Sequence, residues 1–181
     1  MFDEASAKDD HQVEYNVGSG TTSTTAPSNP NGVAYTSEPL SADVRVTGHP
    51  VMQLWVASTA TDGDFIATLQ DVGPSGTITS YNMHGRLRAS LRKEEPAPYN
   101  NLGLPWHPFR KADVMPLTPG EPTLLRFELL PISIVFKAGH RIQVKLSFAD
   151  TATPRLSPAP TVSIYRDATH ASSITLPIIE Q

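Results

Sequence analysis

The 181-residue chain contains no cysteine, no run of 18 apolar residues and no excess of basic charge. Without cysteine, disulfides and thiol catalysis are excluded, but the compartment stays open because many exported proteins also lack cysteine. The missing apolar run speaks against a membrane-spanning helix, and the opening residues have neither the basic nor the apolar part of a signal peptide. A net charge of -4 offers no basic stripe, so neither nucleic acid nor an anionic membrane is expected as a partner.

Motifs for enzyme chemistry are missing as well. No Gly-x-Ser-x-Gly elbow occurs, and the nearest fragments, residues 18–20 and 73–76, have the composition of reverse turns. The six histidines are scattered without the i, i+2 or i, i+4 spacing of a metal-binding pair, so zinc is not predicted. We therefore predict no catalytic residue, no metal and no cofactor in this chain.

Two polar clusters are weaker candidates for a site. Asp62 and Asp64 carry the oxygen ligands that calcium prefers, but the further ligands of a calcium loop are absent, and Asp-Gly also commonly precedes a strand. Arg86, Arg88 and Arg92 share one side of a predicted strand and could hold a phosphate or a carboxylate. Such a row is more often a solvated or ion-paired outer face, so neither cluster is taken as a site.

What the sequence does contain is a series of short strand-like runs separated by turn formers. With 17 prolines and 11 glycines, long helices are not expected. In residues 141–148 apolar and polar side chains alternate strictly, as on a strand with one buried face. Comparable runs cover residues 33–35, 43–47, 51–58, 64–72, 77–81, 125–129, 161–165 and 174–179.

Three local features of these runs lead to further expectations. Residues 134–148, with Gly139 at the corner, are predicted to form a hairpin in which His140 caps the corner. Residues 73–76 are predicted to reverse the chain between two strands. Trp55 lies in the middle of an apolar run and is expected in the core.

The strand rhythm predicts one all-β domain at residues 33–181, preceded by a flexible N-terminal arm or linker at residues 1–32, where large apolar residues are scarce. About ten antiparallel strands without helical crossovers predict a sandwich or a closed barrel. Residues 93–122 are rich in proline and are expected to form a long loop, which favours a jelly-roll β-sandwich.

Large aromatic residues lie in this predicted loop, namely Tyr99, Trp106 and Phe109. They are predicted to contact another domain or a ligand, or to plug the end of the sandwich. Stacking on sugar rings would make the chain a carbohydrate-binding module, and contact with a second copy would make it an oligomerisation module. The residues alone leave these alternatives open, because a fold does not decide a function.

Several short motifs follow one another in a recognisable order. They are Tyr35-Thr36-Ser37-Glu38-Pro39-Leu40, Val46-Thr47-Gly48, Asp62-Gly63-Asp64-Phe65, Leu69-Gln70-Asp71-Val72, Gly85-Arg86-Leu87-Arg88-Ala89-Ser90, Phe136-Lys137-Ala138-Gly139-His140-Arg141-Ile142 and Leu176-Pro177-Ile178. Together they resemble the C-terminal domain of X-Pro dipeptidyl-peptidases and cocaine-esterase-like acyl hydrolases. The resemblance covers Tyr35 to Ile179.

The resemblance implies a galactose-binding-like jelly roll that is itself non-catalytic. In that family the module packs on an α/β-hydrolase domain, helps to wall its substrate cleft and contributes to assembly. The partner expected here is therefore such a catalytic domain, in cis or as a separate chain, with a homo-oligomer as a further option. The Ser-His-Asp triad belongs to the catalytic domain, so His140 and His170 are not interpreted as triad members.

Overall fold

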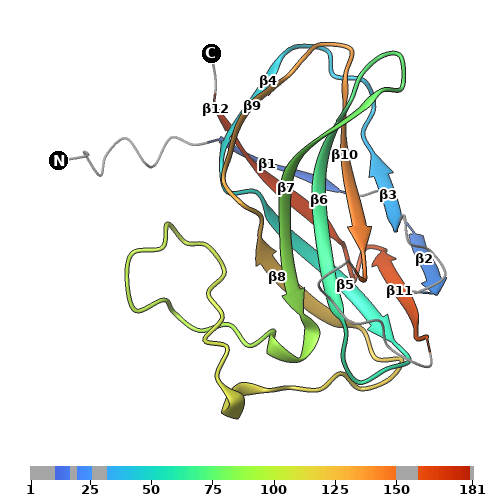
Figure 1. The fold of residues 1–181 in the computed structure, drawn as a ribbon, viewed down its shortest axis with the longest axis vertical. Coiled ribbons are helices and arrows are strands. Elements are labelled where there is room, and N and C mark those ends of the chain that lie inside the picture. Colours follow the sequence, from blue (N-terminus) through green and yellow to red (C-terminus); the bar gives the residue numbers. More distant parts are fainter. Residues whose placement is uncertain (1–10, 17–19, 26–31, 150–158, 180–181) are drawn as a thin grey trace.

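The computed structural model describes residues 11–16, 20–25, 32–149 and 159–179. Its strands form two antiparallel sheets that pack as a sandwich (Figure 1), so the predicted all-β class is confirmed. Within the described ranges, none of the helical segments has the length and apolar character needed to cross a membrane.

The larger sheet has eight strands. Their order is β2 (Gly20–Thr25), β11 (Thr161–Arg166), β5 (Val51–Ser58), β12 (Ser173–Ile179), β4 (Val44–Gly48) and β9 (Ile132–Phe136), with β1 (His11–Asn16) beside β12 and β8 (Thr123–Glu128) beside β5. The bounds of β5 are those that the apolar run predicted. This sheet provides one wall of the core, and its strand β8 leads out of the long loop.

The smaller sheet has four strands. Their order is β3 (Val33–Thr36), β10 (Arg141–Ser147), β6 (Asp64–Val72) and β7 (Ile78–Arg88). Between β6 and β7 the Gly73 N–H donates a hydrogen bond to the Thr77 carbonyl at 2.8 Å, so the predicted reversal is confirmed. Strand β7 is longer than the sequence predicted and lies at the edge of this sheet.

Buried apolar side chains from both sheets form one core cluster. Its fully buried large members include Val46, Met52, Leu54, Phe65, Leu69, Leu125, Leu129, Phe136, Leu146, Ile164, Ile174 and Leu176. Along β10 the residues Ile142, Val144 and Leu146 are buried, as their alternation with polar neighbours predicted. The core therefore follows from the period-two pattern of the individual strands.

The predicted hairpin at residues 134–148 is wrong. Strand β9 pairs with β4 in the larger sheet, whereas β10 pairs with β3 and β6 in the smaller one. Residues 137–140 form a corner that crosses between the sheets, with Gly139 at a φ of 79°. Its backbone bonds to a neighbouring loop, because Gly139 N–H donates to Leu40 O and Leu40 N–H donates to His140 O, both at 2.8 Å. Alternation predicts a strand, but it does not name the partner of that strand.

The predicted place of Trp55 is also wrong. Its neighbours Met52, Leu54 and Val56 are buried, so the alternation of β5 turns Trp55 to the opposite face of the strand. There the half-buried indole lies edge-on to His170, with ring centroids 4.8 Å apart. Its place in the middle of an apolar run suggested a core residue, but its position in the alternation decides otherwise.

The segment expected as an N-terminal arm contributes two strands to the larger sheet. Strand β1 pairs with β12 from His11↔Ile178 to Asn16↔Ser173, and β2 pairs with β11. Backbone pairing of this kind needs no large apolar side chain, which explains why composition alone did not predict it. The domain boundary at residue 32 stays a prediction.

Candidate functional site

Residues 93–122, which we call the excursion, leave the sandwich after β7 and return to it as β8. The short 3-10 segments η3 (Ala89–Leu91) and η4 (Lys111–Asp113) lie before it and within it. Figure 1 shows this yellow-green loop standing away from the two sheets at the lower left. The loop predicted from the prolines is therefore present.

The excursion turns several large apolar side chains outward. Tyr99 is 62% exposed and Phe109 is 60% exposed, and Leu102 beside them is 74% exposed. Leu102 and Phe109 also have positive φ values of 59° and 51°, which non-glycine residues adopt only at a cost of about 1–2 kcal/mol. The backbone therefore stores strain at Leu102 and Phe109, two of the three positions that present these exposed side chains.

The three predicted aromatics come together around one hollow, although they differ in exposure. Trp106 is half-buried, whereas Tyr99 and Phe109 are exposed. The hollow has a volume of about 560 Å³ and lies between the excursion and the ends of β7 and β8. Its lining comprises His49, His84, Gly85, Arg86, Tyr99, Pro105, Trp106, His107, Phe109, Phe127, Glu128, Leu129, Leu130 and Pro131.

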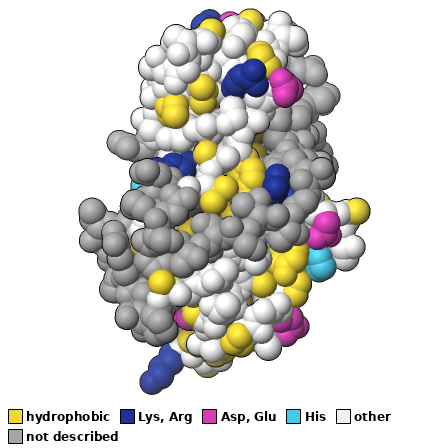
Figure 2. Space-filling view, turned by 90° about the vertical axis from the view of Figure 1, so that its right-hand side faces the viewer, with side chains coloured by type: hydrophobic (Ala, Val, Ile, Leu, Met, Phe, Trp, Pro, Cys, Tyr) yellow, Lys and Arg dark blue, Asp and Glu magenta, His cyan; other side chains and the backbone are white. Residues whose placement is uncertain are grey.

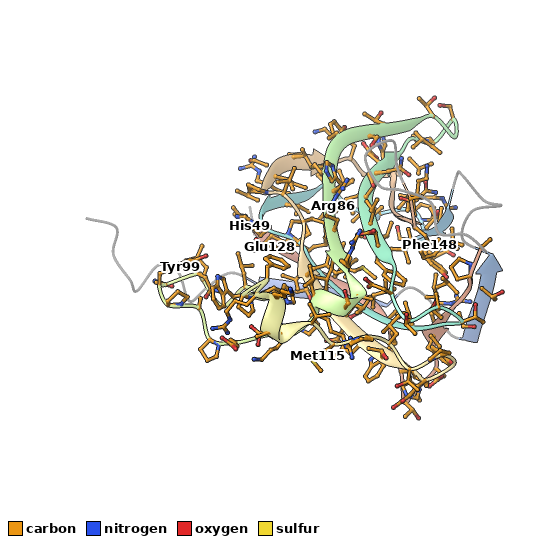
Figure 3. All side chains as sticks on the ribbon, turned by 60° about the horizontal axis from the view of Figure 1, so that its bottom comes forward. His49, Arg86, Tyr99, Met115, Glu128 and Phe148 are labelled. Atoms are coloured by element: carbon orange, nitrogen blue, oxygen red, sulfur yellow. The ribbon has the colours of Figure 1, made fainter. Side chains whose placement is uncertain are left out.

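Polar groups line the sandwich side of this hollow. Figure 3 shows His49 and Glu128 close together on the sandwich and Tyr99 out on the excursion. The His49 Nδ1 atom lies 3.9 Å from Glu128 Oε2. Figure 2 draws the side of the molecule that faces away from the excursion, and there the charged side chains of the described residues do not gather into a patch of one sign. The hollow thus combines aromatic groups on one side with a few charged ones on the other.

A ring of four charges closes the base of the excursion. Lys93 Nζ lies 2.5 Å from Asp113 Oδ1 and 2.8 Å from Glu95 Oε1, while Arg110 contacts Asp113 at 2.6 Å and Glu95 at 2.5 Å. The hydrogen bond from Lys93 lowers the pKa of Asp113 and the pKa of Glu95. Because these carboxyl pKa values are lowered on folding, the stabilisation is present above their ordinary values and is lost as the pH falls through the lowered ones.

His107 fastens the middle of the excursion to the sandwich. The residue is only 8% exposed, and its Nδ1 lies 3.0 Å from the Lys93 carbonyl oxygen while its Nε2 lies 2.8 Å from that of Arg126. The Arg126 side chain in turn contacts Glu94 at 2.7 Å. The sequence predicts no role for His107, because partners that are backbone carbonyls leave no pattern in the sequence.

The possible calcium ligands serve the chain itself. Asp62 accepts hydrogen bonds from Gly63 N–H at 2.9 Å and from the Ser90 N–H and hydroxyl at 2.9 and 2.8 Å. Asp64 forms a two-point ion pair with Arg88 at 2.8 and 3.2 Å. Among the described residues, no group of three His, Asp or Glu side chains is placed to hold a metal.

The arginine row is divided rather than continuous. Arg88 is ion-paired, which agrees with the interpretation of an ion-paired outer face, but Arg92 lies beyond the end of β7 and turns toward the excursion. Its guanidinium donates to the carbonyls of Ala89, at 3.0 Å, and Met115. Burial lowers the pKa of Arg92. Arg92 thus anchors the excursion instead of forming an anion site with Arg86.

The corner histidine serves the fold. His140 N–H donates to the Lys137 carbonyl at 3.0 Å and closes the corner, as predicted. The His140 ring contacts the buried Asp71 of β6 at 2.9 Å, and the Tyr81 hydroxyl donates to the same carboxylate at 3.5 Å. Desolvation, followed by the Asp71 charge, raises the pKa of Tyr81. These contacts tie the corner to the smaller sheet.

The sequence profile described as the X-Pro dipeptidyl-peptidase C-terminal non-catalytic domain matches residues 3–174. The chain belongs to this family. The resemblance predicted from the ordered motifs is therefore confirmed, and the two-sheet sandwich described above is the structure of this non-catalytic domain.

Two relatives indicate the kind of protein in which such a domain occurs. A Mycobacterium bovis protein, whose name suggests a serine esterase, is 43% identical over 152 residues, or 82% of this chain and 24% of its own length. The cocaine esterase of Rhodococcus sp. strain MB1 Bresler is 29% identical over 164 residues, or 82% of this chain and 26% of its own length. The chain thus spans about a quarter of the length of these relatives.

A solved structure agrees with the fold of this non-catalytic domain. The CocE/NonD family hydrolase from Staphylococcus aureus superposes with a TM-score of 0.76 at 19% identity. The match covers 95% of this chain and 37% of that one. At this level of identity the similarity concerns the fold alone.

Proposed function

We propose that this chain acts as the accessory domain of a serine-dependent acyl hydrolase and packs on an α/β-hydrolase domain through the excursion. The observation that carries the proposal is the outward display of apolar side chains on a loop that is firmly held. Family membership and the greater length of the relatives support it. The catalytic domain is part of the same polypeptide or a separate chain.

The excursion has the composition of a protein contact. Tyr99, Leu102 and Phe109 are exposed, and full burial of one such side chain contributes about 1.5–3 kcal/mol. The charged ring that begins at Lys93 and ends at Asp113 belongs to the same loop and would provide the polar rim of this contact. A loop that is already ordered loses little entropy when it docks, which favours tight binding.

In this proposal the chemistry takes place on the companion domain. The companion serine forms an acyl-enzyme that water then hydrolyses, with a histidine as general base. The non-catalytic domain contributes to the wall of the substrate cleft, through the aromatic side of the hollow beside Trp106. Names of the relatives point to esters as substrates. The carbohydrate-binding and oligomerisation alternatives gain no support from these names.

The proposal is tested by reconstituting a hydrolase from two parts. The chain is co-expressed with the part of the Mycobacterium bovis relative that lies outside the matched region. We expect an equimolar complex in size-exclusion chromatography, with p-nitrophenyl ester hydrolysis that depends on the companion. As a control, the matched region of the relative is supplied in trans. If that control assembles and this chain does not, the proposed packing is wrong.

A second experiment tests whether the isolated chain lacks catalytic activity. The purified chain alone is expected to show no ester hydrolysis above the buffer rate and no labelling by a serine-directed phosphonate. Hydrolysis at an enzyme-like rate together with phosphonate labelling would overturn the accessory role.

The contact surface is tested by the double variant Tyr99→Asp, Phe109→Asp. Placing two charges at exposed aromatic positions of an interface should weaken binding by about 100-fold, because aromatic anchors carry much of the energy of such contacts. The matched control is Ile78→Asp, a 53% exposed position on β7 next to the distant β6–β7 turn. Titration calorimetry should show loss only for the double variant. Equal losses in both would place the contact elsewhere.

A further inference from the structure

The two ring nitrogens of His107 face two backbone carbonyl oxygens. Nδ1 lies 3.0 Å from the oxygen of Lys93, and Nε2 lies 2.8 Å from the oxygen of Arg126. A carbonyl oxygen only accepts hydrogen bonds, and a neutral imidazole has only one N–H to donate. Both bonds therefore exist together only when the ring carries a proton on each nitrogen.

The position of the ring gives this requirement a structural consequence. Lys93 is the first residue of the excursion, and Arg126 belongs to β8, just after the excursion ends. His107 therefore joins the middle of the excursion to both its entry and its exit. When the ring is neutral, one of the two carbonyl oxygens faces a nitrogen lone pair instead of an N–H, and this part-buried carbonyl loses its hydrogen-bond partner.

We propose that protonation of His107 latches the excursion against β8, and that loss of the proton loosens it. Trp106, which precedes His107 in the chain, is held at the same place. Its carbonyl accepts a hydrogen bond from Glu95 N–H at 3.1 Å. One consequence rests on the proposed function: docking of the companion domain weakens as the pH rises. The latch itself is a property of this chain.

Other charged groups lie around the ring, and their effects on the pH dependence have to be distinguished from that of His107. The excursion contributes Lys93 and Glu94, and β8 contributes Arg126 and Glu128. The hollow also contains the side chains of His49, His84 and Arg86. Histidines ordinarily change charge between about pH 5 and pH 8, whereas carboxylates and arginines do not. His49 and His84 are thus the groups that could imitate the effect.

Hydrogen exchange of the isolated chain tests the latch. We expect exchange protection of peptides within residues 93–113, corrected for intrinsic rates, to fall about fivefold between about pH 5.5 and pH 8.5, as for the net loss of one hydrogen bond. His107→Gln has one donor nitrogen and should show the weaker protection at both pH values. His49→Gln and His84→Gln should keep the pH dependence. Protection that is independent of pH, or a response that survives in His107→Gln, would overturn the latch.

A measurement on the unaltered chain covers the case in which His107→Gln does not fold. The 15N shifts of the His107 ring should report two protonated nitrogens at about pH 5.5 and one at about pH 8.5. A single neutral tautomer over this whole range contradicts the proposal. Because both measurements use the chain without a companion, a failed reconstitution leaves them valid, and a failed latch leaves the docking test valid.

Discussion

Replacing Gly85 by alanine is expected to destabilise the domain by about 3 kcal/mol or more, the upper range for overpacking a core. For a chain of this size, that loss lowers the melting temperature by about 6–12 °C. Gly85 lies in β7 at the point where the edges of the two sheets meet. Close approach of two backbones, rather than a special φ, is what requires glycine here.

The geometry explains the size of the effect. A Cβ atom on Gly85 would lie 2.2 Å from the Glu128 carbonyl oxygen, 2.9 Å from its carbonyl carbon and 3.0 Å from the Leu129 Cα. All three obstacles are backbone atoms, so no side chain can turn away to make room. Relief requires β8 to move from β7, which would also break the 3.2 Å bond from Leu130 N–H to the His84 carbonyl.

Thermal unfolding followed by circular dichroism measures this effect. Gly63→Ala is the matched control, since a Cβ there meets only the Phe65 ring at 3.7 Å, an ordinary contact distance. The control should change stability by less than about 1 kcal/mol, as for a substitution without strain. A Gly85→Ala chain as stable as the Gly63→Ala chain would contradict the close contact between β7 and β8.

Replacing Phe136 by alanine is expected to cost about 3–5 kcal/mol, because it removes a fully buried aromatic side chain and leaves a cavity. Phe136 ends β9, immediately before the corner that crosses to the smaller sheet. Its ring belongs to the core cluster of the sandwich. The loss should therefore affect the whole domain rather than one strand.

Urea unfolding is suited to this comparison, since the midpoint should fall while the slope stays the same. Phe148→Ala provides the control with the same chemistry. Phe148 is half-buried and lies edge-on to Phe65, with ring centroids 5.6 Å apart, so its truncation should cost less than that of Phe136. Equal costs for both substitutions would mean that burial in the core cluster does not set the stability.

The sequence predicted individual strands well because alternation is a local property. The bounds of β5 and β6 agree with the predicted runs, and the reversal after Val72 follows from its turn residues. Pairing of strands is not local. The apolar faces of β9 and β10 would have suited a hairpin or a crossing between sheets, and the corner of the observed crossing is held by contacts with residues distant in the chain, Leu40 and Asp71.

The candidate site was predictable in part for a similar reason. Tyr99 and Phe109 lie on the predicted proline-rich loop, where both are exposed, and Trp106 joins them at the hollow. Their role in contact with a companion stays a prediction. His107 was not predictable, because its partners are carbonyls of residues 14 and 19 positions away. Backbone groups that meet only in three dimensions have no signature in the amino-acid order.

The pairing of β4 has a consequence for biosynthesis. Val46 faces Ile134 on one side and Ile178 on the other, so this early strand lies between two late ones. A ribosome releases residues 44–48 long before either neighbour has been made. Sheets assembled from such distant segments fold slowly. The nascent first half therefore has to wait with unpaired strands, and chaperones that shield apolar segments are expected to raise the yield of folded protein.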